Sequence, residues 1–399
     1  MKQREGRIPI LTYQGIPLWR DDRVIKGVVQ VVSAIIVVGF LYFFISNILT
    51  AAENRGLALG FDFLSEAAGF PIGESVFIQY DPSMSFGQAF AVGLLNTLKV
   101  SLIGVVFATL VGIIVGVARL STNWLLRSIA GVYIEIVRNV PLLVLLFFIF
   151  FGVFQQLPDV QNSFAIGDLI FLNQRGVYMA WYLTTGSTVT WAIILAAAFI
   201  LAMIAFVILG SYQVRTGRST YPGWIALGIL IGLPIIGWFI LPEQPLNLDL
   251  PVLGKFNFVG GLTLTTQFTA LLIGLIFYTG AFIAEIVRAG IQAVSKGQVE
   301  AAKSIGLKPM QSLRLVIFPQ ALRVVIPPLI SQYLNLTKNS SLAIAIGYPD
   351  MFAVGRIMIN QAGRAVPVFI MIMVTYLLLS LTYSVILNLY NRRIAFVER

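Results

Sequence analysis

Gln298–Arg323 reads QVEAAKSIGLKPMQSLRLVIFPQALR, a polar stretch that lies between two long apolar runs. Its residues 300–303 (EAAK) favour helix. Gly306 is placed to end that helix as a C-terminal glycine, and Pro309 is placed to open a second short one. The stretch therefore predicts a helix–turn–helix that is too polar for the bilayer interior and too short to be a domain.

The composition around this stretch is that of a membrane protein. Of 399 residues, 58% are hydrophobic and only 11% are charged, whereas soluble proteins carry about 25% charged residues. The absence of cysteine excludes disulfides and thiol chemistry, and the absence of histidine removes the commonest metal ligand and general base. The net charge of +10 is expected from Lys and Arg on the cytoplasmic side of a membrane protein, so no nucleic-acid partner is predicted.

Eight apolar runs approach the roughly 20 residues that a helix needs to cross a bilayer. No alternating strand pattern competes with them. The first run is too long for a signal peptide and is expected to be a retained anchor. The fold class expected is an all-α integral membrane protein with about eight transmembrane helices. The runs are residues 24–49, 88–118, 138–157, 188–210, 223–241, 264–290, 315–345 and 366–390.

The charges between the runs predict the orientation of the chain. Lys and Arg are enriched before the first run, after the last one and in the 211–222 and 291–312 connections. The 53–87 loop carries five acidic residues against one arginine. Because cytoplasmic loops carry the excess of Lys and Arg, both termini are expected in the cytoplasm and the 53–87 loop outside.

Two features place charge within the apolar runs. EIVR occurs at Glu135–Arg138 and again at Glu285–Arg288. Glu and Arg three residues apart share a helix face, and each pair is expected to be an ion pair that braces the inner rim. Direct contact with a substrate is the alternative.

The second feature is the polar stretch NLTKNSSLA (Asn335–Ala343), which follows Pro327–Pro328. Paired prolines break the helical hydrogen-bond ladder, and non-helical backbone is expected here beside protein or water. A lysine within a span is a functional hypothesis by default, and its ammonium group could bind the carboxylate of an amino acid. The alternative is that Lys338 pairs with a structural carboxylate or with carbonyls at a helix end. The candidate substrate path comprises Asn335, Lys338, Ser340, Ser341, Tyr278 and Glu285.

The opening stretch resembles the EAA loop of binding-protein-dependent ABC importer permeases, whose pattern is EAA, three residues, Gly, nine residues, then Ile-x-Leu-Pro. Val316 and Phe318 stand where Ile and Leu are usual. YIEIVRNVPLLVLLFFIFFG (Tyr133–Gly152) and GAFIAEIVRAGIQAVSKGQVEAA (Gly280–Ala302) are similar to stretches of the polar-amino-acid branch. The leader and the long 53–87 loop resemble the Q subunit of general L-amino-acid importers.

The resemblance covers about residues 88–390 and implies a type I ABC importer permease fold. In such permeases the EAA loop is a coupling helix that docks on a cytoplasmic ATPase, and the residues concerned here are Glu300, Ala301, Ala302, Lys303 and Gly306. The division expected is a leader at 1–23, an anchor and periplasmic loop at 24–87, the permease domain at 88–390 with its coupling loop at 291–312, and a tail at 391–399.

The resemblance also implies partners. They are a homologous M-type permease subunit, two ATP-binding subunits, a periplasmic amino-acid-binding protein and the lipid bilayer of a bacterial inner membrane. The chain has no G-x-x-x-x-G-K-[ST] motif, so it is expected to be a non-catalytic subunit without a cofactor, and ATP with Mg²⁺ is expected on the partner ATPase.

Three alternatives stay open. An ion-coupled secondary transporter would need coupling sites near the midplane, and a membrane enzyme would need a catalytic constellation that the sequence does not offer. From physics alone, the polar stretch could also be an amphipathic elbow on lipid headgroups. The periplasmic loops 53–87 and 158–187 could contact a binding protein or cap the structure.

Overall fold

The computed structural model describes residues 12–13, 16–17, 22–54, 59–75 and 77–394. Within these residues, seven helices are long and apolar enough to span a membrane, or up to eight if one bent pair counts as a span. The expected helical membrane protein is therefore confirmed. The candidate spans are Val24–Ile48, Phe86–Arg119, Thr188–Thr216, Pro222–Ile240, Thr266–Gln292, Pro309–Ile346 and Ala365–Ile386.

The centre of the molecule is the pair α2 (Phe86–Arg119) and α7 (Thr266–Gln292). Their closest approach depends on glycine: a Cβ on Gly112 would lie 2.4 Å from a methyl carbon of Ile283. Fully buried side chains pack around this pair and form the main core. They include Leu146, Leu271, Leu275, Leu336 and Tyr348.

The expected span at 138–157 is not one straight helix. α3 (Trp124–Asn139) ends before Pro141, and the apolar helix Leu142–Gln156 that follows is bent from it by 108°. The latter begins as α4 (Leu142–Phe147) and continues through a π-helical and a 3₁₀ turn. Val140 is extended, because a residue that precedes proline is disfavoured in the helical region.

The segments outside the spans contain short strands that sequence analysis did not predict. A four-stranded antiparallel sheet has the order β10 (Leu262–Thr265), β5 (Gly176–Met179), β4 (Ile170–Asn173) and β3 (Phe164–Ile166). Strands of three or four residues are too short to show an alternating pattern, and β5 pairs with a strand more than 80 residues away. β6 (Trp181–Thr184) pairs with β7 (Leu246–Asp249), β8 (Val252–Leu253) with β9 (Phe258–Val259), and β1 (Thr12–Tyr13) with β2 (Ile16–Pro17).

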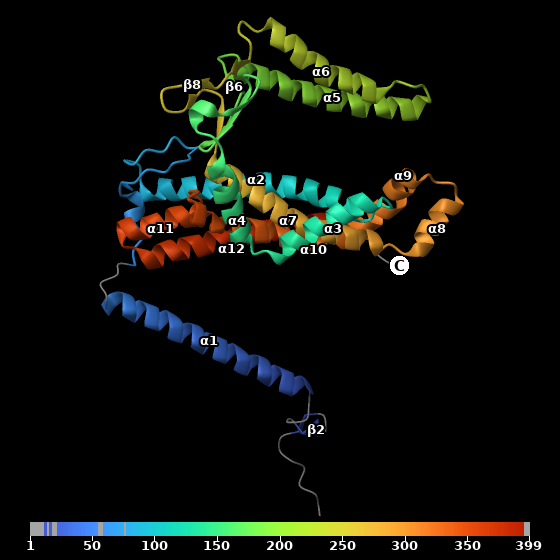
Figure 1. The fold of residues 1–399 in the computed structure, drawn as a ribbon. Helices are drawn as coiled ribbons and strands as arrows, with labels where there is room; N and C mark the ends of the chain where they lie inside the picture. The colour runs from blue at the N-terminus through green and yellow to red at the C-terminus, as the bar shows by residue number, and fades with distance from the viewer. Residues whose placement is uncertain (1–11, 14–15, 18–21, 55–58, 76, 395–399) are drawn as a thin grey trace, which may run out of the picture.

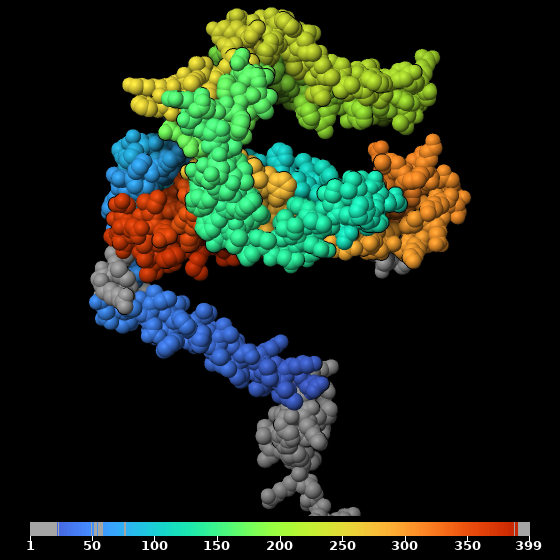
Figure 2. Space-filling view, in the orientation of Figure 1, coloured from blue at the N-terminus to red at the C-terminus, as the bar shows by residue number. Residues whose placement is uncertain are grey.

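Two parts stand away from the bundle. α5 (Thr188–Thr216) and α6 (Pro222–Ile240) form a hairpin that packs through Ala198, Ala202 and Gly237. α1 (Asp22–Asn54) is a separate helix with exposed apolar side chains along its length. Figure 2 shows open space between the α5–α6 hairpin and the bundle. Helices that are apolar all round are typical of contact with lipid.

The last part of the chain contains the predicted helix–turn–helix and three more helices. α8 (Lys296–Ser304) and α9 (Pro309–Ser312) lead through a π-helical turn (Leu313–Ile317) into α10 (Phe318–Asn339). A 3₁₀ helix (Ser340–Ile346) then leads to α11 (Met351–Ala362) and α12 (Ala365–Ile394).

The non-helical backbone expected at Pro327–Pro328 is wrong, because α10 runs through both prolines. The fixed φ of proline is itself helical, so the pair removes amide donors without forcing the chain out of the helix. The stretch around Lys338 is therefore helical backbone.

The arrangement gives the bundle two different ends (Figure 1). α8 and α9 lie at one end, which we call the elbow end, and α12 finishes toward it. Strands β3 to β10 and the segment that precedes α2 lie at the opposite end, which we call the sheet end. The domain boundaries expected from the sequence stay predictions.

Candidate functional site: an exposed elbow and a polar groove

The elbow is built as the sequence predicts. α8 ends in a Schellman motif, in which the amide of Leu307 donates to Ala302 O at 3.2 Å and the amide of Gly306 donates to Lys303 O at 2.9 Å. Gly306 has φ +78°, in the left-handed region that glycine tolerates. Pro309 then occupies the first turn of α9. The helix–turn–helix is therefore confirmed.

The elbow shows most of its side chains to the outside. Glu300, Ala301, Lys303 and Gly306 are exposed. Ala302 is buried, and α8 packs on α9 and on the π-helical turn. Large apolar side chains are exposed beside them, namely Ile305, Met310 and Leu315. An apolar patch with charges at its rim is typical of a surface that another protein covers.

A hollow of about 500 Å³ lies inside the elbow. It is lined on one side by Val299 and Lys303 of α8, and on the other by Pro309, Ser312 and Ile317. Ser312 Oγ is buried without a hydrogen-bond partner. The two short helices of the elbow therefore enclose a hollow and do not form a solid core.

A second hollow lies along α12. A groove of about 710 Å³ has mostly apolar walls and a few polar groups. Lys338 and Ser341 reach it from the end of α10 and the 3₁₀ helix that follows, and Tyr376 and Ser380 reach it from α12. An apolar cleft with few polar groups is the usual form of a small-molecule site.

The structure brings only part of the predicted substrate path together. Asn335 is exposed on α10 but does not line the groove. Ser340 is fully buried and donates to Thr337 O at 2.8 Å. Tyr278 and Glu285 lie on α7 and do not line the groove either. Lys338 and Ser341 are therefore the predicted residues that share a cavity.

The two EIVR stretches behave differently. Arg288 Nε donates to both carboxylate oxygens of Glu285, at 3.0 and 3.1 Å, as expected. Glu135 and Arg138, both within the described residues, form no ion pair. Arg138 instead lies over the ring of Phe282, 5.3 Å from its centroid. Phe282 also contacts the ring of Tyr278, with 5.1 Å between the ring centroids.

Sequence reasoning missed a buried ion pair at the sheet end. Glu74 accepts a hydrogen bond from Lys99 at 2.6 Å, and their side chains are 7% and 11% exposed. Lys99 stands inside the apolar run 88–118, so a lysine within a span was the signal that could have found it. Its partner lies in a loop and carries no such signal.

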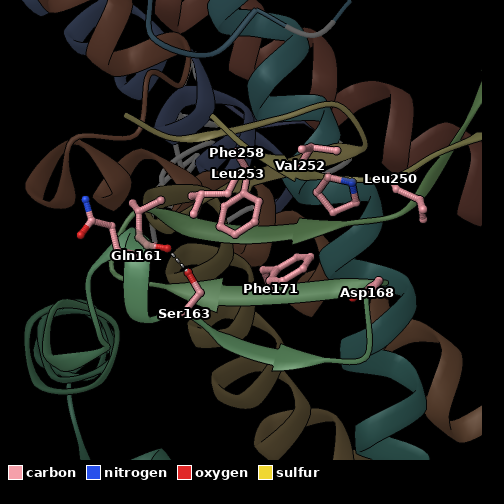
Figure 3. A pocket seen from close by; sticks show the side chains of 10 residues that line it. Gln161, Ser163, Asp168, Phe171, Leu250, Val252, Leu253 and Phe258 are labelled. Atoms are coloured by element: carbon pink, nitrogen blue, oxygen red, sulfur yellow. Dashed lines mark hydrogen bonds between the residues drawn. The ribbon is translucent and has the colours of Figure 1, made fainter. Parts of the chain in front are cut away.

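The sheet end also holds a cavity of about 420 Å³ between the four-stranded sheet and the β8–β9 hairpin (Figure 3). Phe171 and Phe258 line it, and their rings stack at 4.5 Å. Tyr178 lies behind Phe258 at 5.1 Å and is 1% exposed, and burial raises its pKa. This aromatic cluster is a small separate core that keeps the strands together.

Comparison with known proteins decides the family. A family profile of binding-protein-dependent transport system inner membrane components matches residues 222–396. The permease protein YhdX of Escherichia coli is 44% identical over 97% of this chain and 98% of its own length. The chain belongs to the ABC importer permease family. It is the membrane-spanning subunit of a binding-protein-dependent importer, and this family implies a partner ATPase and a binding protein.

Two further permeases are similar over nearly their whole length. The general L-amino acid transport system permease protein AapQ of Rhizobium johnstonii is 41% identical over 93% of this chain and 92% of its own. The glutamate/glutamine/aspartate/asparagine permease protein BztB of Rhodobacter capsulatus is 38% identical over 95% and 96%. ABC importer permeases are multi-pass inner-membrane proteins, in agreement with the apolar helices of this chain.

Proposed function

We propose that this permease carries L-amino acids inward across a bacterial inner membrane, driven by ATP hydrolysis on a partner subunit. The observation that carries the substrate class is the identity of 41% with AapQ over nearly the whole of both chains. The proposal places the elbow end and both termini in the cytoplasm and the sheet end outside, in agreement with the charges between the spans.

The elbow is proposed as the seat of the ATPase. Ala302 anchors α8, while Glu300, Ala301, Lys303 and Gly306 stay exposed at the tip. Small residues at Ala301 and Gly306 permit close approach of a partner backbone, and the charges lie at the rim. Closure of two ATPase copies around ATP and Mg²⁺ would move the elbow and the helices joined to it as a rigid body.

The groove along α12 is proposed as this chain's part of the substrate path. The Lys338 ammonium group would receive the carboxylate of an amino acid, and the Ser341 and Tyr376 hydroxyls would contact its polar groups. Asn335 and Ser340 flank this site, and Tyr278 and Glu285 are proposed to act farther along the path. A homologous M-type subunit would close the open side of the groove and form a heterodimer.

The test is reconstitution of the intact complex. The chain, tagged at its C-terminus, is purified with its partners and inserted into liposomes with an amino-acid-binding protein outside and ATP inside. Expected are a co-purified M-type permease and ATPase, and uptake of labelled L-amino acids that requires ATP. Uptake that persists without ATP would indicate an ion-coupled secondary transporter and overturn the proposal.

A further inference from the structure

The segment between α1 and α2 folds onto the sheet end of the bundle. We call its described residues, 59–75 and 77–85, the strap. Phe63 and Phe70 are buried and lie 5.6 and 6.2 Å from the ring of Phe86, at the start of α2. The Tyr80 hydroxyl donates to Phe70 O at 3.0 Å. The strap is therefore packed structure with its own apolar contacts, not a loose connection.

One carboxylate of the strap joins two helices. Glu74 Oε1 accepts from Lys99 of α2 at 2.6 Å, and its Oε2 accepts from the hydroxyl of Thr265 at 2.7 Å. That hydroxyl also caps α7 by accepting from the amide of Phe268 at 3.1 Å. The Lys99 ammonium group lies 4.1 Å from the centroid of the Phe268 ring. The strap, α2 and the first turn of α7 thus share one largely buried polar cluster.

A second set of bonds adds the segment before α11. Asn96 of α2 donates to Glu74 O at 2.8 Å and to Pro349 O at 2.9 Å. The Tyr348 hydroxyl donates to Asn96 O at 3.1 Å. Asp62 of the strap accepts from Arg364, between α11 and α12, at 3.2 Å. Strap, α2, α7 and α11 therefore meet in one network.

We propose that the strap is a permanent lock, which holds the sheet ends of α2, α7 and α11 together as one unit throughout transport. Moving α2 from α7 would break the Thr265–Glu74 hydrogen bond and take the Phe268 ring away from the Lys99 ammonium group, and it would cost two largely buried charges their remaining partners. No passage for substrate then opens between α2 and α7. Substrate must instead pass along the outer surface of the unit formed by α2, α7 and α11. The inference rests on the proposed transport function.

The first test locks the strap covalently. The chain has no cysteine, so an introduced pair is the one pair of thiols in this chain, and the same oxidation of the wild-type complex controls for thiols of the partners. A Cβ on Gly87 would lie 3.9 Å from Leu64 Cβ, within the 3.5–4.5 Å that disulfides use. Oxidised Leu64→Cys/Gly87→Cys complex is expected to transport within two-fold of its reduced form. A reductant-reversible loss above five-fold would show that the strap must move and would overturn the lock.

The second test asks whether α2 and α7 ever part. Ala270 lies on α7 five residues after Thr265 and is fully buried in the main core, so it becomes accessible only when the helices packed around α7 move apart. In the complex with Ala270→Cys as its one cysteine, a membrane-impermeant thiol reagent added outside during ATP turnover is expected to give no labelling. Labelling of this cysteine during turnover with Glu74 intact would overturn the inference.

The Glu74–Lys99 pair is tested against the same readout. Glu74→Gln in the Ala270→Cys chain is expected to raise labelling at least ten-fold above the background seen with Glu74 intact, because Lys99 loses its counter-charge. Adding Lys99→Met is expected to bring the rate back, because no unpaired charge stays buried. An unchanged rate in Glu74→Gln would contradict the role of the pair. If Glu74→Gln does not assemble, the disulfide and Ala270→Cys arms still decide.

Failure of the two proposals can be told apart. A complex that takes up amino acids without ATP contradicts the proposed function, whatever the labelling shows. A complex with ATP-driven uptake in which Ala270→Cys is labelled contradicts only the lock.

Discussion

The α2–α7 pair and the elbow differ in what surrounds their small residues. At Gly112 a single added Cβ meets Ile283 at 2.4 Å, whereas nothing lies within 4 Å of a Cβ at Gly306 or at Gly297 of α8. The first region is closed by its own chain and the second is open toward something else. The contrast teaches that small residues serve internal packing at Gly112, whereas on the elbow they leave open the surface on which we propose that the ATPase docks.

The sharpest way to break this contrast is Gly112→Val. The added side chain would overlap Ile283 and the backbone of Ala284, which lies 3.2 Å from the added Cβ, and overpacking destabilises by about 1–3 kcal/mol or more. We expect loss of folded permease from the membrane, measured as the monodisperse fraction after detergent extraction. Gly210→Val, on α5 with nothing within 4 Å, is the matched control. Normal yield of the Gly112 variant would show that the pair is not closed.

A substitution in the elbow should have the opposite effect: transport is lost and folding is unchanged. Glu300→Lys reverses a charge on an exposed side chain. We expect at least a ten-fold drop in ATP-driven uptake while yield and thermal stability stay at the wild-type level, because no buried contact changes. Glu243→Lys makes the same reversal at an exposed residue of the opposite end and should leave the coupling of ATPase to uptake intact. Equal uptake in wild type and Glu300→Lys would contradict the docking role.

Lys338 sharpens the comparison because its side chain is exposed although it lies within a span. Lys338→Ala removes the cation of the α12 groove, and we expect a several-fold higher KM for amino-acid uptake with assembly unchanged. Lys338→Arg keeps the charge and should retain more of the uptake. Normal uptake of every amino acid tested in the alanine variant would remove Lys338 from the substrate path.

Asp350, twelve residues after Lys338, belongs to the region that is packed by its own chain. Its substitution is expected to have the smallest effect of the four. Asp350 lies between spans, is fully buried and caps α11 by accepting from the amide of Ala353 at 2.8 Å. Burial raises its pKa to about 7. An unfolded aspartate releases its proton near pH 4, while the folded one holds it to about pH 7. Stability contributed by this proton is therefore full below pH 4 and falls as pH rises toward 7.

Asp350→Asn keeps the cap and removes this titration. We expect the midpoint temperature of the variant to exceed that of wild type by about 2 °C or more at pH 8, with a smaller difference at pH 5. Thermal unfolding of the purified complex at both pH values measures it. A larger gain at pH 5 than at pH 8 would contradict a protonated, buried Asp350.

The elbow could be predicted from sequence because its signals are local. Gly306 ends one helix and Pro309 opens the next, and both act within a few residues of chain. The spans were predictable for the same reason, since each is one continuous apolar run. Lys338 could be singled out as a lysine in such a run, and the structure places it in a groove.

The contacts that join distant parts could not be predicted in this way. Glu74 meets Lys99 and Thr265 across 25 and 191 residues, and the sheet pairs β5 with β10 on either side of an entire hairpin. Arg138 likewise faces Phe282 rather than Glu135, because the packing of α3 on α7 decides its partner. The bend at Val140 carried a local signal in Pro141, but the apolar run around it favoured a single straight span.

The pairing of β5 with β10 has a further consequence for the α5–α6 hairpin. Because Met179 and Leu262 are register partners, the chain leaves and re-enters the sheet at the same place. Residues 180–261 are therefore a side branch, and the points where it joins the trunk are already held together. Only the α5–α6 hairpin of this branch stands clear of the sheet, because Phe258 of the same branch packs on Phe171 and Tyr178 of the sheet.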